Sequence, residues 1–226
     1  MKLSKKTLSI LKSFSSINPV IYFGDPKAIK VVSPDGGVIG CYQADESINR
    51  ECSFWETPKL LATIDSMGGE EAELDFNDKF VKIVSNDKSS LKYFYTPEAM
   101  ILSSNPKPKS YEAYCKAMEM NVEFELPVEM FNKIMKLSQV MQLNNLKIEF
   151  ENDKGKIFLL DDTNKVSHNF EYDINGKGTG SITLYISSLN IIPGTYNIVI
   201  KSGLFSKFIN KDIPLFYIVA GKKEQK

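Results

Sequence analysis

The hydrophobic positions between Glu125 and Val140 follow the period of an α-helix. At about 100° per residue, five apolar side chains in and just after "ELPVEMFNKIMKLSQV" fall on one side. They are Met130, Phe131, Ile134, Leu137 and Met141. The opposite side carries Asn132, Lys133, Lys136 and Gln139. The pattern predicts a helix over 127–140 with one face in a core and one basic face turned away from it.

One helix followed by antiparallel strands is a pattern that occurs four times along the chain. The first copy has a helix over 4–16 and strands over 20–23, 28–33 and 38–43; the second has Thr57 as N-cap, a helix over 58–67 and strands over 72–76, 80–84 and 91–95. The third has a strand over 121–125, the helix over 127–140 and strands over 146–151, 156–160 and 167–173. The fourth has a strand over 182–186, a degenerate helix over 187–191 and strands over 196–201 and 214–220. A helix with a single apolar stripe cannot bury it alone, so the copies should pair.

Pairing of the four copies predicts two similar domains in an α+β fold, with sheets on one side and helices on the other. We place the first domain at 1–108 and the second at 109–226. The boundary falls in the proline- and lysine-rich stretch "SSNPKPKSYEAY", where no hydrophobic period survives. The connector between the domains should extend over about 103–120.

The composition indicates a large core and no excess of either charge. Of 226 residues, 42% are hydrophobic and 11% are aromatic, which predicts a globular protein. The 28 basic residues equal the 28 acidic residues, so the totals give no sign of a tight nucleic-acid binder. Cys41, Cys52 and Cys115 form no C-x-x-C pair and indicate reduced thiols in a cytoplasm.

No segment has the composition of a signal peptide or of a membrane span. The N-terminal stretch "MKLSKKTLSILKSF" interrupts its apolar residues with lysines. Residues 178–200 carry no charge and are long enough to cross a bilayer. Their serines, threonines and asparagines, together with the Pro193-Gly194 turn, instead predict two strands joined by a short turn. We therefore expect no contact with a membrane.

Residues typical of catalysis are few and scattered. The single histidine, His168, lies in the alternating run "VSHNFEYD", which predicts a strand and a structural role. Asp161 and Asp162 could form a metal-binding pair, but no second cluster supplies ligands, and adjacent carboxylates before "TNK" more often form a solvated turn. The stretch "GKGTG" at 176–180 lacks phosphate-loop spacing and predicts a flexible hairpin loop. We expect a protein that is not an enzyme and has no metal site and no cofactor.

Lysines recur on the polar faces of three predicted helices. They are Lys5 and Lys12 in the first helix, Lys59 in the second, and Lys133 and Lys136 in the third. Each face alone is consistent with ordinary solvation, but three equivalent positions with small polar neighbours and almost no acid favour a shared function. The acidic residues gather instead in turns and strands. Lysine with short polar side chains, without aromatic residues and with almost no arginine, suits sequence-independent contact with duplex phosphates.

Several stretches of the chain resemble the DNA polymerase sliding clamps, most closely the replication clamps of T-even-like phages. They are "MKLSK" with its continuation "ILKSF", the helix "FELPVEMFNKIMKLSQV" followed by "LKIEFENDKGKIFL", and the late stretch "IIPGTYNIVI". The resemblance covers nearly the whole chain as a pattern, whereas 24–56 matches poorly. It implies the DNA-clamp fold: a ring of six similar domains, with sheets outside and helices lining a hole that encircles double-stranded DNA.

The resemblance also implies the partners of the protein. With two domains per chain, the ring would be a homotrimer, placed on DNA by an ATP-dependent clamp loader and holding a DNA polymerase. If the chain is viral, it would act in the cytoplasm of the infected host cell. The lysine faces would then face the DNA inside the hole. The closed ring would retain the DNA without tight binding, and no catalytic group would be needed.

A hydrophobic pocket for a C-terminal peptide of the polymerase is expected near the connector. Its candidate residues are Ile101, Leu102, Tyr111, Tyr114, Pro214, Phe216 and Val219. These residues are apolar in segments that the implied fold brings together, and a groove beside a connector is a usual way to capture a short peptide. The alternative is that they pack beneath the connector as core, since Phe216 and Val219 lie on opposite strand faces.

Two further hypotheses stay open on the sequence alone. A β-rich structural or scaffold protein of a virion could be built from the same repeats with no role in encircling DNA. A metal-dependent nuclease would use Asp161 and Asp162. A closed trimer would favour the clamp, and cleavage of DNA with magnesium or manganese would favour the nuclease.

Overall fold

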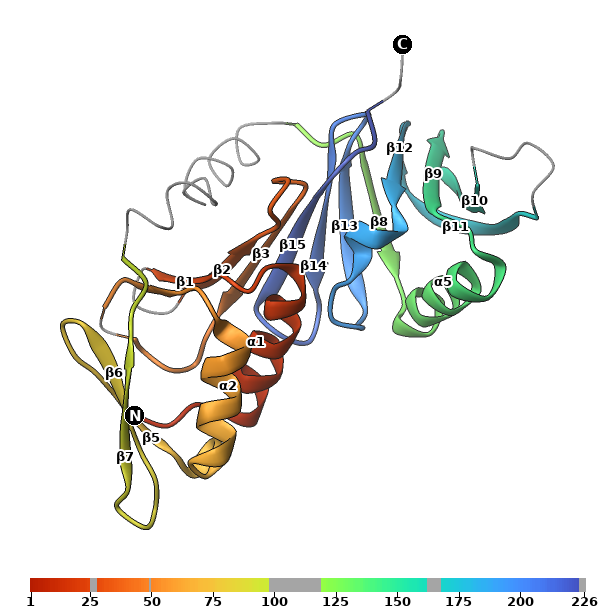
Figure 1. Ribbon diagram of the computed structural model, residues 1–226. Coiled ribbons are helices and arrows are strands. Elements are labelled where there is room, and N and C mark those ends of the chain that lie inside the picture. Colours follow the sequence, from red (N-terminus) through yellow and green to blue (C-terminus); the bar gives the residue numbers. More distant parts are fainter. Residues whose placement is uncertain (25–27, 49, 98–118, 162–167, 224–226) are drawn as a thin grey trace. The chain divides into compact units, whose positions relative to one another are not determined.

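The computed structural model describes residues 1–24, 28–48, 50–97, 119–161 and 168–223. The chain forms two compact units, which we call unit 1 (Met1–Pro108) and unit 2 (Lys109–Lys226). Every strand pair in the described parts of the two units is antiparallel, and the helices are few (Figure 1). The α+β class predicted from the sequence is therefore confirmed.

Unit 1 consists of two helices packed on one antiparallel sheet, with a second, smaller sheet beside them. Its helices are α1 (Lys5–Ile17), α2 (Thr57–Ser66) and the short 3-10 helix η1 (Gly69–Glu71). Its strands are β1 (Ile21–Gly24), β2 (Ala28–Val32), β3 (Val38–Gln43), β4 (Cys52–Phe54), β5 (Glu73–Phe76), β6 (Phe80–Val84) and β7 (Ser90–Phe94). The strand orders are β4-β1-β2-β3 and β5-β6-β7. Helices α1 and α2 lie side by side (Figure 1), and α1 packs on β1, β2 and β3.

The first residues of the chain extend the smaller sheet of unit 1. The Leu74 N–H of β5 donates to the Met1 carbonyl at 2.6 Å, and the Met1 ammonium donates back to the Leu74 carbonyl at 2.7 Å. Leu3 is buried two residues later. The segment before α1 therefore takes the place of a fourth strand next to β5.

Unit 2 contains one α-helix and eight strands among its described residues. Helix α5 (Val128–Met141) is followed later by the short 3-10 helix η2 (Ile186–Leu189). The strands are β8 (Val122–Leu126), β9 (Asn145–Glu151), β10 (Lys154–Leu160), β11 (Phe170–Gly178), β12 (Gly180–Tyr185), β13 (Tyr196–Lys201), β14 (Phe205–Asn210) and β15 (Leu215–Ala220). Their order is β12-β9-β10-β11-β8-β13-β14-β15. The Phe131 ring of α5 packs on Tyr196, which is fully buried and also contacts Phe208 and Tyr217.

The strand orders show the repetition predicted from the sequence. In each unit, the strand after the first helix (β1 or β9) pairs with the next strand (β2 or β10) and with the strand before the second helical segment (β4 or β12). The second sheets also correspond, because β5-β6-β7 with the Met1 segment matches β13-β14-β15 with β8. The predicted arrangement of two similar halves, each of two helix-plus-strand repeats, is confirmed.

Two strands were absent from the sequence prediction. Strand β4 has only three residues, "CSF", which is too short to show a period. Strand β14, "FSKFIN", begins directly after the tight turn at Gly203, whose φ of 68° suits glycine. Strand β11 runs from Phe170 to Gly178 and is therefore longer than, and shifted from, the predicted strand over 167–173.

The "GKGTG" stretch was wrongly predicted to be a flexible hairpin loop. It joins β11 and β12, but these strands do not pair with each other: β11 pairs with β10 and β8, and β12 pairs with β9. The chain therefore crosses here from one side of the sheet β12-β9-β10-β11 to the other. Gly178 has a φ of 102°, and a Cβ on it would lie 1.9 Å from the Asn121 carbonyl oxygen. The glycine is required by this close approach of two strands.

The helices differ from their predicted bounds in three details. The N-cap of α2 is Glu56, so Thr57 is the first helical residue and Pro58 follows it. The fourth predicted helix is reduced to the single turn of η2. Met141 was assigned to the core face of α5, but it is 39% exposed, and Ser138 is buried beside Phe131 and Ile134 instead.

Candidate nucleic-acid interface

The lysines singled out from the sequence lie on the exposed faces of α1, α2 and α5. We call Lys5, Lys12, Lys59, Lys133 and Lys136 the lysine faces, and all five residues are exposed. In α1 the buried residues are Thr7, Ile10, Leu11 and Phe14, as the helical period predicts. In α2 they are Thr57, Leu60, Leu61 and Ile64. The apolar stripes therefore turn the lysines away from the core.

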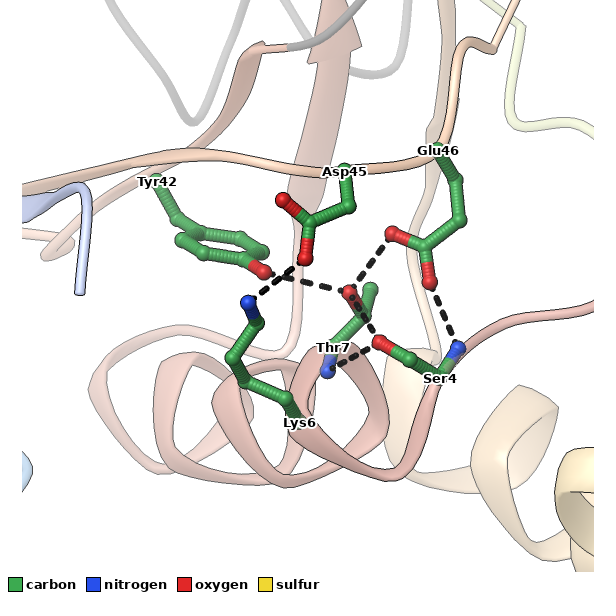
Figure 2. Close-up of polar contacts among 6 residues, drawn as sticks. All are labelled: Ser4, Lys6, Thr7, Tyr42, Asp45 and Glu46. Carbon is green, nitrogen blue, oxygen red and sulfur yellow. Dashed lines mark hydrogen bonds and ion pairs between the residues drawn. The ribbon is translucent and has the colours of Figure 1, made fainter.

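The N-terminus of α1 is anchored by a polar network that comes from a distant loop (Figure 2). Ser4 is the N-cap, and its hydroxyl oxygen accepts from the Thr7 N–H at 3.2 Å. The Glu46 carboxylate accepts from the Ser4 N–H at 2.5 Å and from the Thr7 hydroxyl at 2.8 Å. The first turn of α1 contains no acidic residue of its own, so Glu46 supplies the negative charge that a helix N-terminus favours.

An ion pair in this network distinguishes Lys6 from its neighbour Lys5. The Lys6 ammonium lies 2.5 Å from the Asp45 carboxylate (Figure 2), and this hydrogen bond raises the pKa of Lys6. Thr7, which is fully buried, also lies 3.3 Å from the hydroxyl of the buried Tyr42. The network therefore neutralises Lys6 and leaves Lys5 exposed.

Glu46 should make the stability of unit 1 depend on pH. Burial alone would raise the pKa of its carboxyl group, but the hydrogen bonds from Ser4 and Thr7 outweigh burial and lower it. Because the unfolded pKa is about 4.3, the carboxylate stabilises the fold above that pH, and this contribution is lost as the pH falls through the lower folded value.

We therefore expect Glu46→Gln to destabilise the protein by about 1–2 kcal/mol near neutral pH, since hydrogen bonds to charged groups contribute roughly that much or more. The difference from the wild type should shrink at an acid pH below the lowered folded pKa of Glu46, where the carboxyl group is protonated. Urea unfolding at the two pH values measures both. Glu151→Gln, which removes an exposed carboxylate at the end of β9, should stay within about 0.5 kcal/mol of the wild type. A Glu46→Gln difference that does not change with pH would contradict this assignment.

Two of the five lysines have partners within their own unit. The Lys59 ammonium lies 3.1 Å from the carboxylate of Glu56, three residues earlier. The Lys133 ammonium lies 5.3 Å from the centre of the Phe170 ring. Lys5, Lys12 and Lys136 form no ion pair and no ring contact with the residues that the structure describes. These three lysines are thus the ones most available to an anionic partner.

Comparison with known proteins finds similar proteins that match this chain over most of its length. No protein-family model matches the chain. It is 23% identical over 221 residues to the sliding clamp of Vibrio phage KVP40, covering 96% of this chain and 97% of that one. The sliding clamp of Escherichia phage RB69 is 22% identical over 209 residues, covering 88% and 87%.

This chain is a relative of the phage sliding clamps.

Solved structures agree on the clamp fold at lower sequence identity. The chain superposes with a TM-score of 0.69 on A. fulgidus PCNA, solved with the C-terminal region of FEN-1 bound, over 97% of this chain and 96% of that one at 13% identity. A PCNA2-PCNA3 complex from Sulfolobus tokodaii gives a TM-score of 0.68, 10% identity and 96% coverage of both chains. The chain has the clamp fold over nearly its whole length.

Only some residues of the predicted peptide pocket lie in the described part of the chain. Ile101, Leu102, Tyr111 and Tyr114 lie outside the described residues. Pro214 is exposed at the start of β15, and Phe216 is half-buried beneath the ammonium of Lys207, which lies 4.3 Å from its ring centre. Val219 is fully buried and lies on the other face of β15. Of the three described residues, Pro214 and Phe216 are thus the ones that a peptide could reach.

The other groups considered from the sequence form no chemical site in the described part of the clamp fold. His168 is exposed just before β11 and was wrongly placed on a strand. Asp162 lies outside the described residues, and no group of three or more metal-binding side chains occurs within them. None of the described helices is long and apolar enough to cross a membrane.

Sequence reasoning found the lysines but missed the network that holds α1. The partners Ser4 and Glu46 are 42 residues apart, and nothing in the spacing of either residue signals the other. The available signal was indirect: α1 begins with a serine N-cap but has no acid in its first turn. Such a helix can draw its negative charge from elsewhere in the fold.

Proposed function

We propose that the chain is a sliding clamp that encircles duplex DNA as a homotrimer and holds a replicative DNA polymerase on its template. The observation that carries this proposal is the set of exposed lysine faces on α1, α2 and α5 in a chain with the clamp fold. A clamp loader driven by ATP would open and close the ring around DNA, in the cytoplasm of an infected cell. The clamp itself would catalyse no reaction.

The charge distribution supports weak contacts inside a ring better than a tight grip on DNA. A binder that relies on contact makes about 6–10 phosphate contacts and loses affinity steeply with salt. Here the chain is neutral overall, and two of the five lysines in the lysine faces already have partners. Lysines without base-reading neighbours would let the duplex slide while the closed ring keeps it from leaving.

Two unpaired strand edges support the closure of the ring. Strand β7 pairs with β6 on one side, and no described strand covers its other side, where Phe94 is 64% exposed and Leu91 is 41% exposed. In unit 2, β11 pairs with β8 only over Gly176–Gly178, so its second edge is uncovered by any described strand from Phe170 to Asn175. An exposed apolar edge favours pairing with another chain. Different edges on one subunit give a head-to-tail contact, which closes a ring if the rotation fits.

Native mass spectrometry should therefore find a species with three times the mass of the 25.5 kDa chain. The exposed apolar edge strand of one copy should be covered in this complex, so Phe94→Glu should shift the population towards single chains. Val140→Glu, a matched change at an exposed residue of α5, should leave the trimer intact. A monomer, or an open series of larger polymers, would instead support a structural or scaffold protein.

Peptide capture should depend on the exposed end of β15. We expect Pro214→Ala and Phe216→Ala each to weaken a peptide from the C-terminus of the polymerase by about fivefold to tenfold, since anchoring side chains contribute about 1 kcal/mol or more. Tyr114→Ala should act in the same direction. Isothermal titration of the peptide into each purified variant measures the affinity.

The controls for this prediction separate the pocket from the fold. Val140→Ala removes an exposed aliphatic side chain from α5 and should leave the affinity unchanged. Each pocket variant should keep the native mass of the wild type. Unchanged affinity in the Pro214, Phe216 and Tyr114 variants would place peptide binding elsewhere on the clamp.

A further inference from the structure

A polar groove in unit 2 lies apart from the lysine faces and from the proposed peptide pocket. It has a volume of about 1750 Å³ and is bounded by the C-terminal end of α5, by β9 and β12, and by the segment after β15. Its lining includes Lys147, Ser181, Thr183, Tyr185, Ser202 and Lys223. Neither the lysine faces nor Pro214, Phe216 and Val219 contribute to this lining.

The reduced fourth helix contributes part of the groove wall. Where the first three repeats have helices of ten or more residues, the fourth has the four residues of η2. Ile186 and Ser187 of this short turn line the groove together with Gln139 and Gln142 of α5.

The lining of the groove is rich in donors and carries more positive than negative charge. Among its described residues are three lysines, Lys147, Lys222 and Lys223, and one carboxylate, Glu149. Lys147 and Glu149 form an ion pair at 2.6 Å. Most of the remaining lining consists of serine, threonine, asparagine and glutamine side chains. Ammonium, hydroxyl and amide groups are the side chains that bind phosphodiester oxygens.

An aromatic ring stands at the edge of the groove, and a lysine holds it in place. Tyr185 is 44% exposed although the Lys222 ammonium lies 5.1 Å from its ring centre. Lys222 also donates to the Asn145 side-chain oxygen at 3.3 Å. An exposed ring beside fixed positive charge is the combination on which unpaired bases stack in single-strand binding proteins.

The edge of β12 argues against an extended peptide as the occupant. The Ser181 N–H donates to the Ser202 hydroxyl, and the Ser181 carbonyl accepts from the Gly203 N–H, both at 2.9 Å. The Thr183 carbonyl accepts from the Lys222 N–H at 2.7 Å. A partner strand would need these same groups. Of the three aliphatic lining residues, Leu143 and Ile182 are buried, which leaves the partly exposed Ile186 as the single aliphatic anchor that the described lining offers to an apolar side chain.

We propose that this groove binds a short stretch of single-stranded nucleic acid. Lys147, Lys222 and Lys223 contact its phosphates, and one base stacks on the Tyr185 ring. The site goes beyond the encirclement of duplex DNA, because it needs neither a closed ring nor a clamp loader. The groove would let the clamp bind the unpaired strand that adjoins the duplex inside the ring.

Fluorescence anisotropy with a labelled twelve-nucleotide oligothymidylate tests the site on the full-length protein, without loader or polymerase. We expect measurable binding at low salt that weakens as salt is added, and weaker binding to a duplex of the same length. Tyr185→Ala should reduce affinity for the oligonucleotide by about tenfold, which is within the range measured for one stacked base. Tyr185→Phe keeps the ring and should bind like the wild type.

Charge variants separate this site from the lysine faces. Lys222→Glu combined with Lys223→Glu should weaken oligothymidylate binding by about tenfold or more, because two phosphate contacts become repulsive. Lys154→Glu changes an exposed lysine of β10 outside the groove and should have no effect on this binding. Lys136→Glu should leave oligothymidylate binding unchanged while impairing DNA-dependent stimulation of the polymerase. The two sites can thus fail independently.

Four outcomes would overturn the proposal. No detectable binding of oligothymidylate at low salt would show that the groove is not a nucleic-acid site. Equal binding of Tyr185→Ala and wild type would exclude stacking on this ring. Loss of binding in Lys136→Glu, with no loss in the groove variants, would assign the oligonucleotide to the lysine faces. Displacement of the oligonucleotide by a glutamate-rich peptide that binds more tightly would make the partner a polypeptide.

Discussion

The loaded protein should remain on closed circular DNA through a wash with roughly 1 M salt, where the screening length is only about 3 Å. Contacts made by lysines would be screened under these conditions, whereas a closed ring has no route off an intact circle. Cutting the circle with a restriction enzyme should release the protein within the time needed to slide to an end. Gel filtration of labelled protein on nicked circles, before and after cutting, measures both states.

A protein held by contact alone would behave in the opposite way. With about 6–10 phosphate contacts, its affinity would fall by roughly 10³–10⁵ between 50 and 200 mM salt, equally for circles and for linear molecules. Loss from the intact circle at moderate salt would therefore count against encirclement. Circles with a bulky protein block at each cut end provide the control, because the ring should stay on them after cutting.

Ile134→Ala should destabilise unit 2 by about 2–5 kcal/mol, the usual cost of removing buried methyl and methylene groups from a core. Ile134 is 1% exposed and lies on the buried face of α5 beside Phe131. Lys136, two residues later, is exposed and has no ion-pair partner among the described residues. Lys136→Glu should keep the free energy of unfolding within about 0.5 kcal/mol of the wild type.

Lys136→Glu, which should leave the stability unchanged, should nevertheless impair function. Lys136→Glu places a carboxylate where the proposed ring meets DNA phosphates, so it should impair DNA-dependent stimulation of the polymerase although the fold is intact. Lys154→Glu, outside the lysine faces, controls for the change of charge itself. Urea unfolding and primer extension on long templates measure the two effects. Equal destabilisation by Ile134→Ala and Lys136→Glu would mean that the two faces of α5 are exchanged.

The helical period alone was enough to separate the two faces of α1, α2 and most of α5. It failed at the end of α5, where Ser138 is buried and Met141 is exposed. The Ser138 hydroxyl donates to the Met135 carbonyl at 2.7 Å, so its polar group is satisfied within the helix and can enter the core. Gln142 then ends the helix with a φ of 54°, so Met141 is the last helical residue. A hydrophobicity pattern contains neither fact.

The sequence predicted which charged residues form the candidate site, but not which residues contact them. Exposed lysines on three helices follow from spacing, because the apolar stripe fixes the opposite face. Lys59 has a local partner, Glu56, three residues earlier. Phe170, however, is 37 positions beyond Lys133, and Asp45, which pairs with the neighbouring Lys6, is 39 positions beyond it. The groove beside β12 brings together residues of α5, β9, β12 and the segment after β15, which are far apart in the sequence, so no local pattern signals it.

The pairing of the Met1 segment with β5 constrains the order in which the parts of unit 1 can fold during synthesis. Their backbone hydrogen bond joins residues 73 positions apart, across α1, the whole β1–β4 sheet and α2. On the ribosome, the first residues emerge long before the strand that will hold them, whereas α1 and β1–β3 already have local contacts. The Met1 segment therefore stays unattached until most of unit 1 has been synthesised, although it is made before the strand that holds it.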